Sequence, residues 1–248
     1  LENIVLPDGV TTIGDNAFAR CTSLKSIGLG NSLQTLGTAV FASCSSLERI
    51  VLPETLKTIA ERTFYKCSAL SSVTMEGVQQ IDDYAFYRCE KLTNISLPQS
   101  LTSVGNYAFF RCSLKNLCIP DNVTYVGAHA FNGNTSLTLY AQAEQAPEGW
   151  NARWNSAFRP AVFGCEFATD DNGTYVVSFV KNKQTLLNFN SVKDDSADVS
   201  SKYTDPTRSG YEFGGWTTVG ETPVVYKTSD FANVPDDTEL IAIWNKIN

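Results

Sequence analysis

The sequence has 248 residues, of which 43% are hydrophobic and 18% are charged, and its formal net charge is −7 at pH 7. These values are ordinary for a globular protein long enough to bury a core and to divide into two domains. The sequence has no run of about 18 apolar residues that would insert into a membrane, and its negative charge argues against nucleic acid as a partner.

The first part of the chain is an internal repeat. A leucine recurs every 22 or 23 residues, at Leu1, Leu24, Leu47, Leu70, Leu92, Leu114 and Leu137. Each of the six units reads approximately L-x-x-I-x-L-P-x-x-V-x-x-I-G-x-x-A-F-x-x-C-x-x. One unit is too short to bury an apolar face alone, so stacked copies are expected to share one core. The pattern is already under way at residue 1, so we expect a leader and earlier repeats to precede it in a longer protein.

Each unit predicts two short strands and a turn. Apolar residues alternate at Ile4 and Leu6, and again at Ile95 and Leu97, as in a half-buried strand. A proline often follows and ends that strand, because proline has no N–H to donate. A second extended piece, such as residues 10–13, runs to a glycine. The A-F-x-x-C segment predicts a helical or 3₁₀ turn with Phe and Cys facing inward.

The repeat pattern resembles the BspA-like (Treponema pallidum type) leucine-rich repeats, over about residues 1–140. The resemblance implies a solenoid of short parallel strands and short helical or 3₁₀ turns, with strands about 4.8 Å apart. It also implies a surface-displayed bacterial adhesin. No catalytic residue is carried over from that family, so the chain is not expected to be an enzyme.

Residues 141–165 break the period and are interpreted as a C-terminal cap of the solenoid. Trp150, Trp154, Phe158 and Phe163 would cover the open end of the core, which every solenoid must close. The alternative is that these rings form an aromatic ligand site.

A second domain is predicted over residues 166–248. This part carries 13 acidic and 7 basic residues, whereas residues 1–165 are almost balanced. Residues 166–169 and 175–180 predict a hairpin around Asp170-Asp-Asn-Gly173. The motif P-x-R-x-G-Y-x-F-x-G-W at residues 206–216 and the apolar end at residues 240–244 resemble the Listeria–Bacteroides repeat, a small β-grasp-like module. Its usual Gly-rich opening is replaced here by Lys181-Asn-Lys-Gln-Thr. The resemblance implies a mainly β domain that acts as a spacer or weak binding unit.

The seven cysteines are interpreted mainly as buried thiols. Five of them hold the same repeat position and face the core, namely Cys21, Cys44, Cys67, Cys89 and Cys112. A buried free cysteine behaves as a small hydrophobic residue. Disulfides and a metal site remain as alternatives, although no C-x-x-C spacing occurs. Cys118 is expected to face outward from its strand and to be the one reactive thiol.

Catalytic and metal-binding patterns are weak. His129 is the single histidine and is interpreted as a surface substitution. Asp194, Asp195 and Asp198 are interpreted as a solvated loop rather than a calcium site, because no EF-hand spacing follows. No phosphate-binding or zinc-protease motif is present. We therefore predict no catalytic residue, no cofactor and no metal.

Two surface stripes are candidates for binding. The outward strand positions form a small, mostly neutral face: Asn3, Ser26, Arg49, Ser72, Asn94 and Asn116, with Val5, Gly28, Val51, Thr74, Ser96 and Cys118. The second stripe flanks the repeated Phe and is the preferred site, because aromatic residues beside Arg are enriched where proteins bind. Its candidate binding residues are Tyr65, Tyr84, Tyr87, Tyr107, Phe110, Arg88 and Arg111, with His129 and Lys66 beside them. The alternative is that these rings simply pack against each other.

The sequence thus favours a non-enzymatic adhesin or protein-binding module at the bacterial cell surface. Its partner would be a protein or glycan on host matrix or on other cells, and the chain itself is expected to be monomeric. The alternatives are a structural spacer or a carbohydrate-binding unit of a larger secreted protein.

Overall fold

The computed structural model describes residues 2–159, 161–169, 175–180, 211–218, 225–226 and 240–246. The chain forms two compact units. Unit 1 comprises Leu1–Lys115, Pro120–Leu137 and Pro147–Arg159, and unit 2 comprises Asn116–Ile119, Thr138–Ala146 and Pro160–Asn248.

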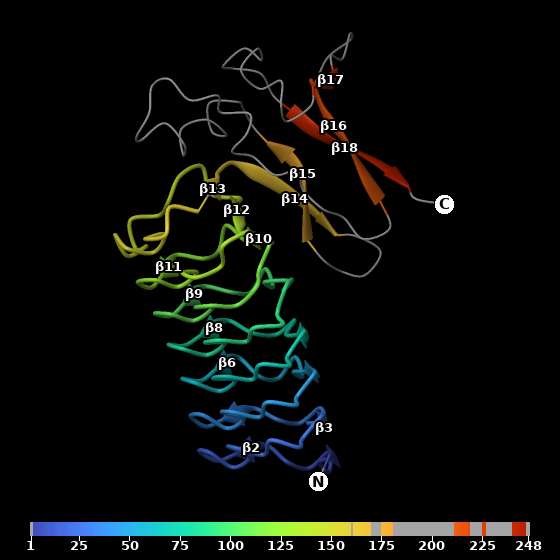
Figure 1. Ribbon diagram of the computed structural model, residues 1–248, viewed down its shortest axis with the longest axis vertical. Coiled ribbons are helices and arrows are strands. Elements are labelled where there is room, and N and C mark those ends of the chain that lie inside the picture. The colour runs from blue at the N-terminus through green and yellow to red at the C-terminus, as the bar shows by residue number, and fades with distance from the viewer. Residues whose placement is uncertain are drawn as a thin grey trace. The chain divides into compact units, whose positions relative to one another are not determined.

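Unit 1 is a solenoid with two rows of short strands. The first row holds β1 (Asn3–Val5), β3 (Ser26–Gly28), β5 (Arg49–Val51) and β7 (Ser72–Thr74). The second row holds β2 (Thr12–Ile13), β4 (Thr35–Leu36), β6 (Thr58–Ile59), β8 (Gln80–Ile81), β9 (Ser103–Val104) and β11 (Tyr125–Val126). The paired strands in these rows are parallel, and Figure 1 shows β6, β8, β9 and β11 one above another. The repeat prediction is confirmed.

One expected strand is missing. Residues 94–97 have no strand assignment in the structure. Ile95 and Leu97 nevertheless remain buried, as the alternating pattern predicts. The apolar alternation therefore located the core side chains correctly but was wrong about the strand.

The repeated phenylalanines form the centre of the core. Phe18, Phe41, Phe64, Phe86, Phe109 and Phe131 stack with successive ring centroids 5.1 to 5.9 Å apart. From Phe41 onward these side chains are at most 1% exposed. Stacking brings the same ring from each unit into contact with its neighbours, which a single unit of 22 or 23 residues cannot achieve. The inward orientation predicted for the Phe is confirmed.

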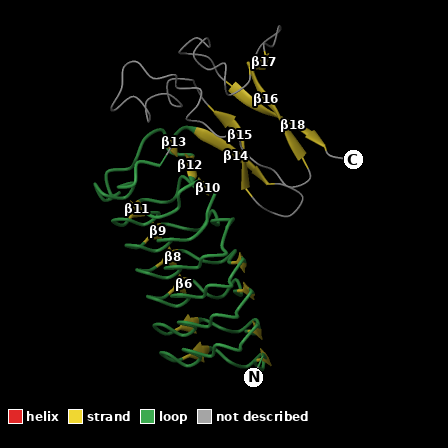
Figure 2. Ribbon diagram, in the orientation of Figure 1, coloured by secondary structure: helices red, strands yellow, loops and turns green. Residues whose placement is uncertain are grey.

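In the turn that carries each Phe, the N–H of residue i+3 donates to the carbonyl of residue i, but the turn does not continue as a helix. The N–H groups of Ala17, Ala19 and Cys21 donate within the turn, whereas those of Asn16, Phe18 and Arg20 donate to carbonyl groups of the next repeat. Two residues per turn have positive φ, for example 57° at Asn16 and 63° at Arg20. Alternate N–H groups thus point along the stack, and Figure 2 shows these turns as loops between the strands.

The described residues of unit 2 form two sheets. The first is parallel, with the order β10 (Asn116–Ile119), β12 (Thr138–Ala141) and β13 (Ala161–Val162). The second is antiparallel, with the order β14 (Cys165–Thr169), β15 (Tyr175–Val180), β18 (Leu240–Lys246), β16 (Tyr211–Thr218) and β17 (Val225–Tyr226). The antiparallel pairing predicted for residues 166–169 with 175–180 and the predicted final strand are confirmed, and the turn at residues 170–173 lies outside the described residues. The residues 181–185 and Asp194, Asp195 and Asp198 lie outside the described residues.

Candidate binding surface

The hydrogen bonds between successive repeats hold the outer residues of their turns in register. The N–H of Lys66 donates to Tyr87 O, that of Arg88 to Phe110 O, and that of Arg111 to Asn132 O. A residue at one turn position therefore lies directly beside its equivalent in the next unit. Residues placed two before and one after the buried Phe consequently form two adjacent rows on the surface.

Six rings in these rows form a surface that we call the aromatic panel: Tyr65, Tyr84, Tyr87, Tyr107, Phe110 and His129. In one row Tyr65, Tyr87 and Phe110 stack with centroids 4.9 Å apart. In the other row Tyr84 stacks on Tyr107 at 5.2 Å and Tyr107 stacks on His129 at 4.9 Å. Tilted contacts of 5.7 Å and 5.6 Å join the two rows. The panel spans the third to the sixth repeat, since the first and second repeats have Asn16, Ala19, Ala39 and Ala42 at these positions.

Cationic side chains cover ring faces of the panel. The guanidinium carbon of Arg62 lies 5.2 Å from the Tyr84 centroid, and that of Arg111 lies 5.5 Å from the Phe110 centroid. Lys66 Nζ lies 5.2 Å from the centroid of its neighbour Tyr65. These distances are within the range of cation–π attraction.

The seven predicted binding residues thus lie together on one surface of the solenoid. The five rings among them are neither fully buried nor fully exposed. Their mutual stacking matches the alternative reading that the rings pack against each other, and their partial exposure keeps them accessible to a partner. Sequence reasoning missed Arg62, although Arg62 holds the repeat position of Tyr84 and Tyr107 and that spacing would have found it.

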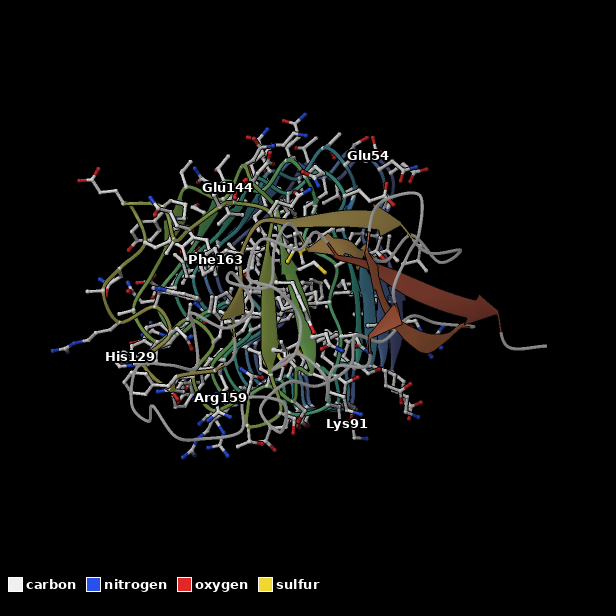
Figure 3. All side chains as sticks on the ribbon, turned by 90° about the horizontal axis from the view of Figure 1, so that it is seen from above. Glu54, Lys91, His129, Glu144, Arg159 and Phe163 are labelled. Atoms are coloured by element: carbon white, nitrogen blue, oxygen red, sulfur yellow. The ribbon has the colours of Figure 1, made fainter. Side chains whose placement is uncertain are left out.

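His129 ends one row of the panel. It is partly buried, and its Nδ1 atom lies 2.7 Å from Ser156 Oγ. The prediction placed His129 at the surface, at the repeat position of Tyr84 and Tyr107, and its ring continues the stack of Tyr107. Figure 3, viewed along the stack, shows His129 on the edge opposite Glu54.

Acidic side chains lie at the start of the third and fourth turns beside the panel, at Glu61, Asp82 and Asp83. Burial, reinforced by the nearby charges of Asp83 and Glu61, raises the pKa of Asp82. Asp83 instead accepts hydrogen bonds from the backbone and side-chain nitrogens of Asn106, at 2.6 Å and 3.1 Å. Burial also raises the pKa of Tyr84, with smaller effects from neighbouring groups. Tyr84 therefore stays neutral near pH 7.

The strand face is less flat than the sequence suggested. Val5 is 84% exposed and Val51 is 63% exposed, with Gly28 between them in the strand row. Because Gly28 has no side chain, a shallow hollow of about 350 Å³ opens here, and a second hollow adjoins it at Asn31 and Pro53. This face is a competing candidate surface.

The prediction for Cys118 is wrong. All seven cysteines are thiols in the structure, but Cys118 is only 8% exposed, and burial raises its pKa to about 12. The cause is that β10 and β12 are buried on both faces, unlike β1 or β5, and β15 contacts β10 within unit 2. Cys21 is the exposed thiol, so the expectation that it faces the core is wrong, whereas Cys44, Cys67, Cys89 and Cys112 are buried as predicted. We expect a thiol reagent to label Cys21 and not Cys118 in the native protein.

The segment after the last repeat makes the same kind of backbone hydrogen bonds to the sixth repeat as the repeats make to one another. The N–H of Asn151 donates to Val126 O, and the N–H of His129 donates to Arg153 O. Trp150 is 6% exposed, and its Nε1 donates to Val123 O at 3.0 Å. Phe158, in contrast, is 80% exposed, so the expectation that it covers the core is wrong. It ends a turn at a φ of 50° and lies outside the apolar interior.

The described part of the chain contains neither a cluster of metal-binding side chains nor a membrane-spanning helix. There, no three His, Cys, Asp or Glu side chains gather as metal ligands would. The same residues include no helix with the length and apolarity that a bilayer crossing requires.

Comparison with known proteins matches both parts of the chain. The BspA type leucine rich repeat region matches in six copies over residues 1–78 and 75–145, and the Listeria-Bacteroides repeat domain matches residues 175–243. No curated protein matches the sequence significantly.

Solved structures show the same fold. The T. pallidum leucine rich repeat protein TpLRR is 29% identical with a TM-score of 0.55, over 59% of this chain and 70% of that protein. A leucine rich cell surface protein from Faecalibacterium prausnitzii A2-165 is 24% identical with a TM-score of 0.50, over 71% of this chain and 53% of its own length. The chain thus spans about half of the second relative.

Proposed function

Because the chain belongs to the BspA-type leucine-rich-repeat family and carries a Listeria–Bacteroides repeat domain, we propose that it is a surface-displayed bacterial adhesin module that binds a protein through the aromatic panel. Both families are generally binding or structural modules rather than enzymes. The proposed contact residues are Tyr65, Tyr84, Tyr87, Tyr107, Phe110, Arg88 and Arg111.

The observation that carries this proposal is the alignment of large, half-exposed rings in four successive units. Aromatic and Arg side chains dominate binding energies where they are already held in place. Here each ring is fixed by stacking on its neighbours before any partner arrives, so little side-chain entropy remains to be lost on binding. An apolar strip of this kind on a protein surface marks an interaction site.

The proposed organisation follows the repeat. Residues 1–140 form the array, residues 141–165 cap its end, and residues 166–248 form the small β-rich domain that serves as a spacer or weak binding unit. The name of the F. prausnitzii relative, a cell surface protein, supports an extracellular location.

Ring geometry favours a protein over a sugar as the partner of the panel. Sugars are held by stacking on an open aromatic face. Tyr87 has Tyr65 on one face and Phe110 on the other, and Tyr107 lies between Tyr84 and His129 in the same way. A carbohydrate-binding role would therefore need another surface, and a pure spacer would need none.

The test begins with the full chain on a panel of matrix proteins and a glycan array. For a protein partner found there, replacing Tyr65, Tyr87 and Phe110 together by Ala should weaken binding at least about 100-fold, or about 2.7 kcal/mol. The melting temperature should stay within a few degrees. Tyr125→Ala is the matched control, because Tyr125 is a 41% exposed tyrosine on β11 that is not one of the panel rings.

Unchanged binding by the triple variant would reject the panel and direct attention to Val5 and Val51 on the strand face. Binding to glycans alone would support the carbohydrate-binding alternative. A large fall in melting temperature would show that the three rings stabilise the fold by packing. Binding by the three single Ala variants would then be compared at a temperature where each variant is folded.

A further inference from the structure

The cations around the aromatic panel differ in how their charges are compensated. Arg62 pairs with Glu61 at 2.8 Å, and both Nε and Nη2 of Arg88 donate to Glu90 Oε1, at 3.1 Å and 2.9 Å. Lys66 and Arg111 have no ion pair within the described residues. The panel thus presents two uncompensated positive charges although the whole chain is acidic.

These two charges are held at corresponding places. Lys66 and Arg111 occupy the same turn position two repeats apart, and each lies over the ring of the residue before it in the sequence. Arg111 is positioned further by Gly133, because a Cβ at Gly133 would lie 2.6 Å from Arg111 Cγ. At the usual spacing of about 4.8 Å per unit, the two cations are about 10 Å apart along the stack.

The surface between the two cations is formed by aromatic ring edges, next to the Arg88–Glu90 ion pair. The faces of Tyr87 are closed by its neighbours, so the part of this ring that meets solvent is its edge and hydroxyl. An aromatic ring carries positive charge at its edge and negative charge on its face. A row of ring edges between two cations therefore favours a ligand with acidic groups and an apolar backbone between them.

We propose that the aromatic panel binds an acidic, proline-rich segment of a partner protein in the polyproline II conformation. This inference rests on the proposed function and specifies the partner of the same surface. Polyproline II rises about 3.1 Å per residue with three residues per turn, so acidic residues at every third position lie on one face about 9.3 Å apart. That repeat matches the separation of Lys66 and Arg111.

An extended strand fits less well. Its side chains on one face recur every two residues, at about 6.7 Å, and residues three apart point to opposite faces. Proline-rich segments also dock on aromatic surfaces with little loss of conformational entropy. A sulfated glycan offers anions but lacks the pyrrolidine rings that would pack against the ring edges of Tyr87 and Phe110.

The experiment measures binding of the full chain to a labelled peptide of four Glu-Pro-Pro repeats by fluorescence anisotropy. The comparison ligands are four Lys-Pro-Pro repeats, four Glu-Gly-Ser repeats and a heparin oligosaccharide. The Glu-Pro-Pro peptide should bind at least about ten-fold more tightly than each of the three. Its affinity should fall as salt rises from 0.05 to 0.5 M, because exposed charges are screened.

Two variants should shift affinity in opposite directions. Lys66→Ala should weaken binding of the Glu-Pro-Pro peptide about three-fold, the scale of one exposed ion pair. Glu90→Gln releases Arg88 as a third cation in the row and should strengthen binding by a similar factor. Such a gain cannot arise from unfolding. Lys57→Ala is the charge-matched control, since its ammonium donates to Glu54 O in the loop between β5 and β6, outside the turn that carries the panel.

Equal binding of the acidic and basic peptides, or no gain with Glu90→Gln, would overturn the inference. Tighter binding of heparin would overturn it in favour of a glycan. If every peptide binds equally and the triple aromatic variant abolishes all binding, the acidic segment is rejected while the panel remains a protein-binding surface. The two proposals therefore fail by different results.

Discussion

At the scale of single residues, the repeated cysteine does more than fill space. The thiols of Cys44, Cys67 and Cys89 donate to the carbonyl of the Phe in the preceding unit, at 3.1, 3.0 and 3.2 Å. Asn134 replaces the cysteine in the sixth unit and makes the same contact, from Nδ2 to Phe109 O at 2.8 Å. The position therefore selects a small side chain that can donate a hydrogen bond, which explains why Asn substitutes for Cys there.

Phe64 tests the central stack. Phe64→Ala should lower the free energy of unfolding by about 3–5 kcal/mol, the usual cost of emptying a buried aromatic site. The reason is that Phe64 is fully buried between Phe41 and Phe86. Urea titration measures the change. Phe158→Ala is the matched control and should shift stability by less than about 0.5 kcal/mol, because that ring is 80% exposed. A loss below about 1 kcal/mol at Phe64 would reject the core assignment.

The buried thiols predict how stability depends on pH. Burial raises the pKa of Cys112 and of Cys118 to about 12, whereas a thiol in the unfolded chain titrates near 8.5. Above that pH the unfolded chain loses protons that the folded chain retains, so the free energy of unfolding falls as pH rises. Each such thiol should contribute a loss of about 1.4 kcal/mol per pH unit between about 9 and 12, and the full stability should be present below about pH 8.

Urea titrations at pH 8, 9 and 10 under reducing conditions measure this slope. Cys112→Ala removes one titrating group, so its slope between pH 9 and 10 should be shallower by about 1.4 kcal/mol per pH unit, although its stability at pH 8 is lower. An identical slope in the variant would show that Cys112 does not keep its proton in the folded state.

At the scale of the element, the turn is governed by its hydrogen bonds to the next unit rather than by helical propensity. Non-glycine residues adopt positive φ at two places in each turn, such as Arg62 at 57° and Lys66 at 59°. This conformation costs roughly 1–2 kcal/mol per residue. It persists because the N–H groups of Arg62, Phe64 and Lys66 all donate to the following unit. The resulting register is what aligns the rings of the panel.

Ser43 tests the conformational cost of the turn. Its φ is 61°, and Gly133 holds the equivalent position in the sixth unit. Ser43→Gly should therefore be neutral or stabilising by up to about 1 kcal/mol, because glycine adopts this conformation without strain. Ser43→Val should destabilise by more than about 1 kcal/mol, because β-branched residues disfavour it most. Thermal unfolding measures both, and a Val variant as stable as the Gly variant would contradict the account.

At the scale of the whole molecule, the period of the sequence was enough to predict the solenoid. The spacing of Phe and of the alternating aliphatic residues reports directly on which side chains face the core. The same pattern could not predict the left-handed residues, since Arg62 or Tyr84 at those places carries no local preference for positive φ. It also missed the burial of Cys118, because that depends on β12 and β15, which are distant in the sequence. The hollow at Gly28 arises only from the difference between neighbouring units.

The proposed cap makes a prediction about the distribution of stability along the array. In a repeat protein each unit is stabilised mainly by its neighbours, so losing a cap should loosen the adjacent unit first. Trp150 lies against the sixth repeat, where it is buried and its Nε1 donates to Val123 O. Trp150→Ala should destabilise the protein by about 3–5 kcal/mol. Trp150→Phe keeps an aromatic ring but loses the hydrogen bond, so its loss should be smaller.

Hydrogen exchange resolves where that stability is lost. In Trp150→Ala the amides of the sixth unit, such as Gly127, should lose protection, whereas those of the third unit, such as Phe64, should retain most of theirs, because local opening follows local contacts. Both amides are hydrogen bonded to a neighbouring unit in the native protein, so they are comparable reporters. Equal loss at both would show that the array unfolds as one cooperative block. No loss at Gly127 would show that the segment after the repeats does not close the core, and the cap would be rejected.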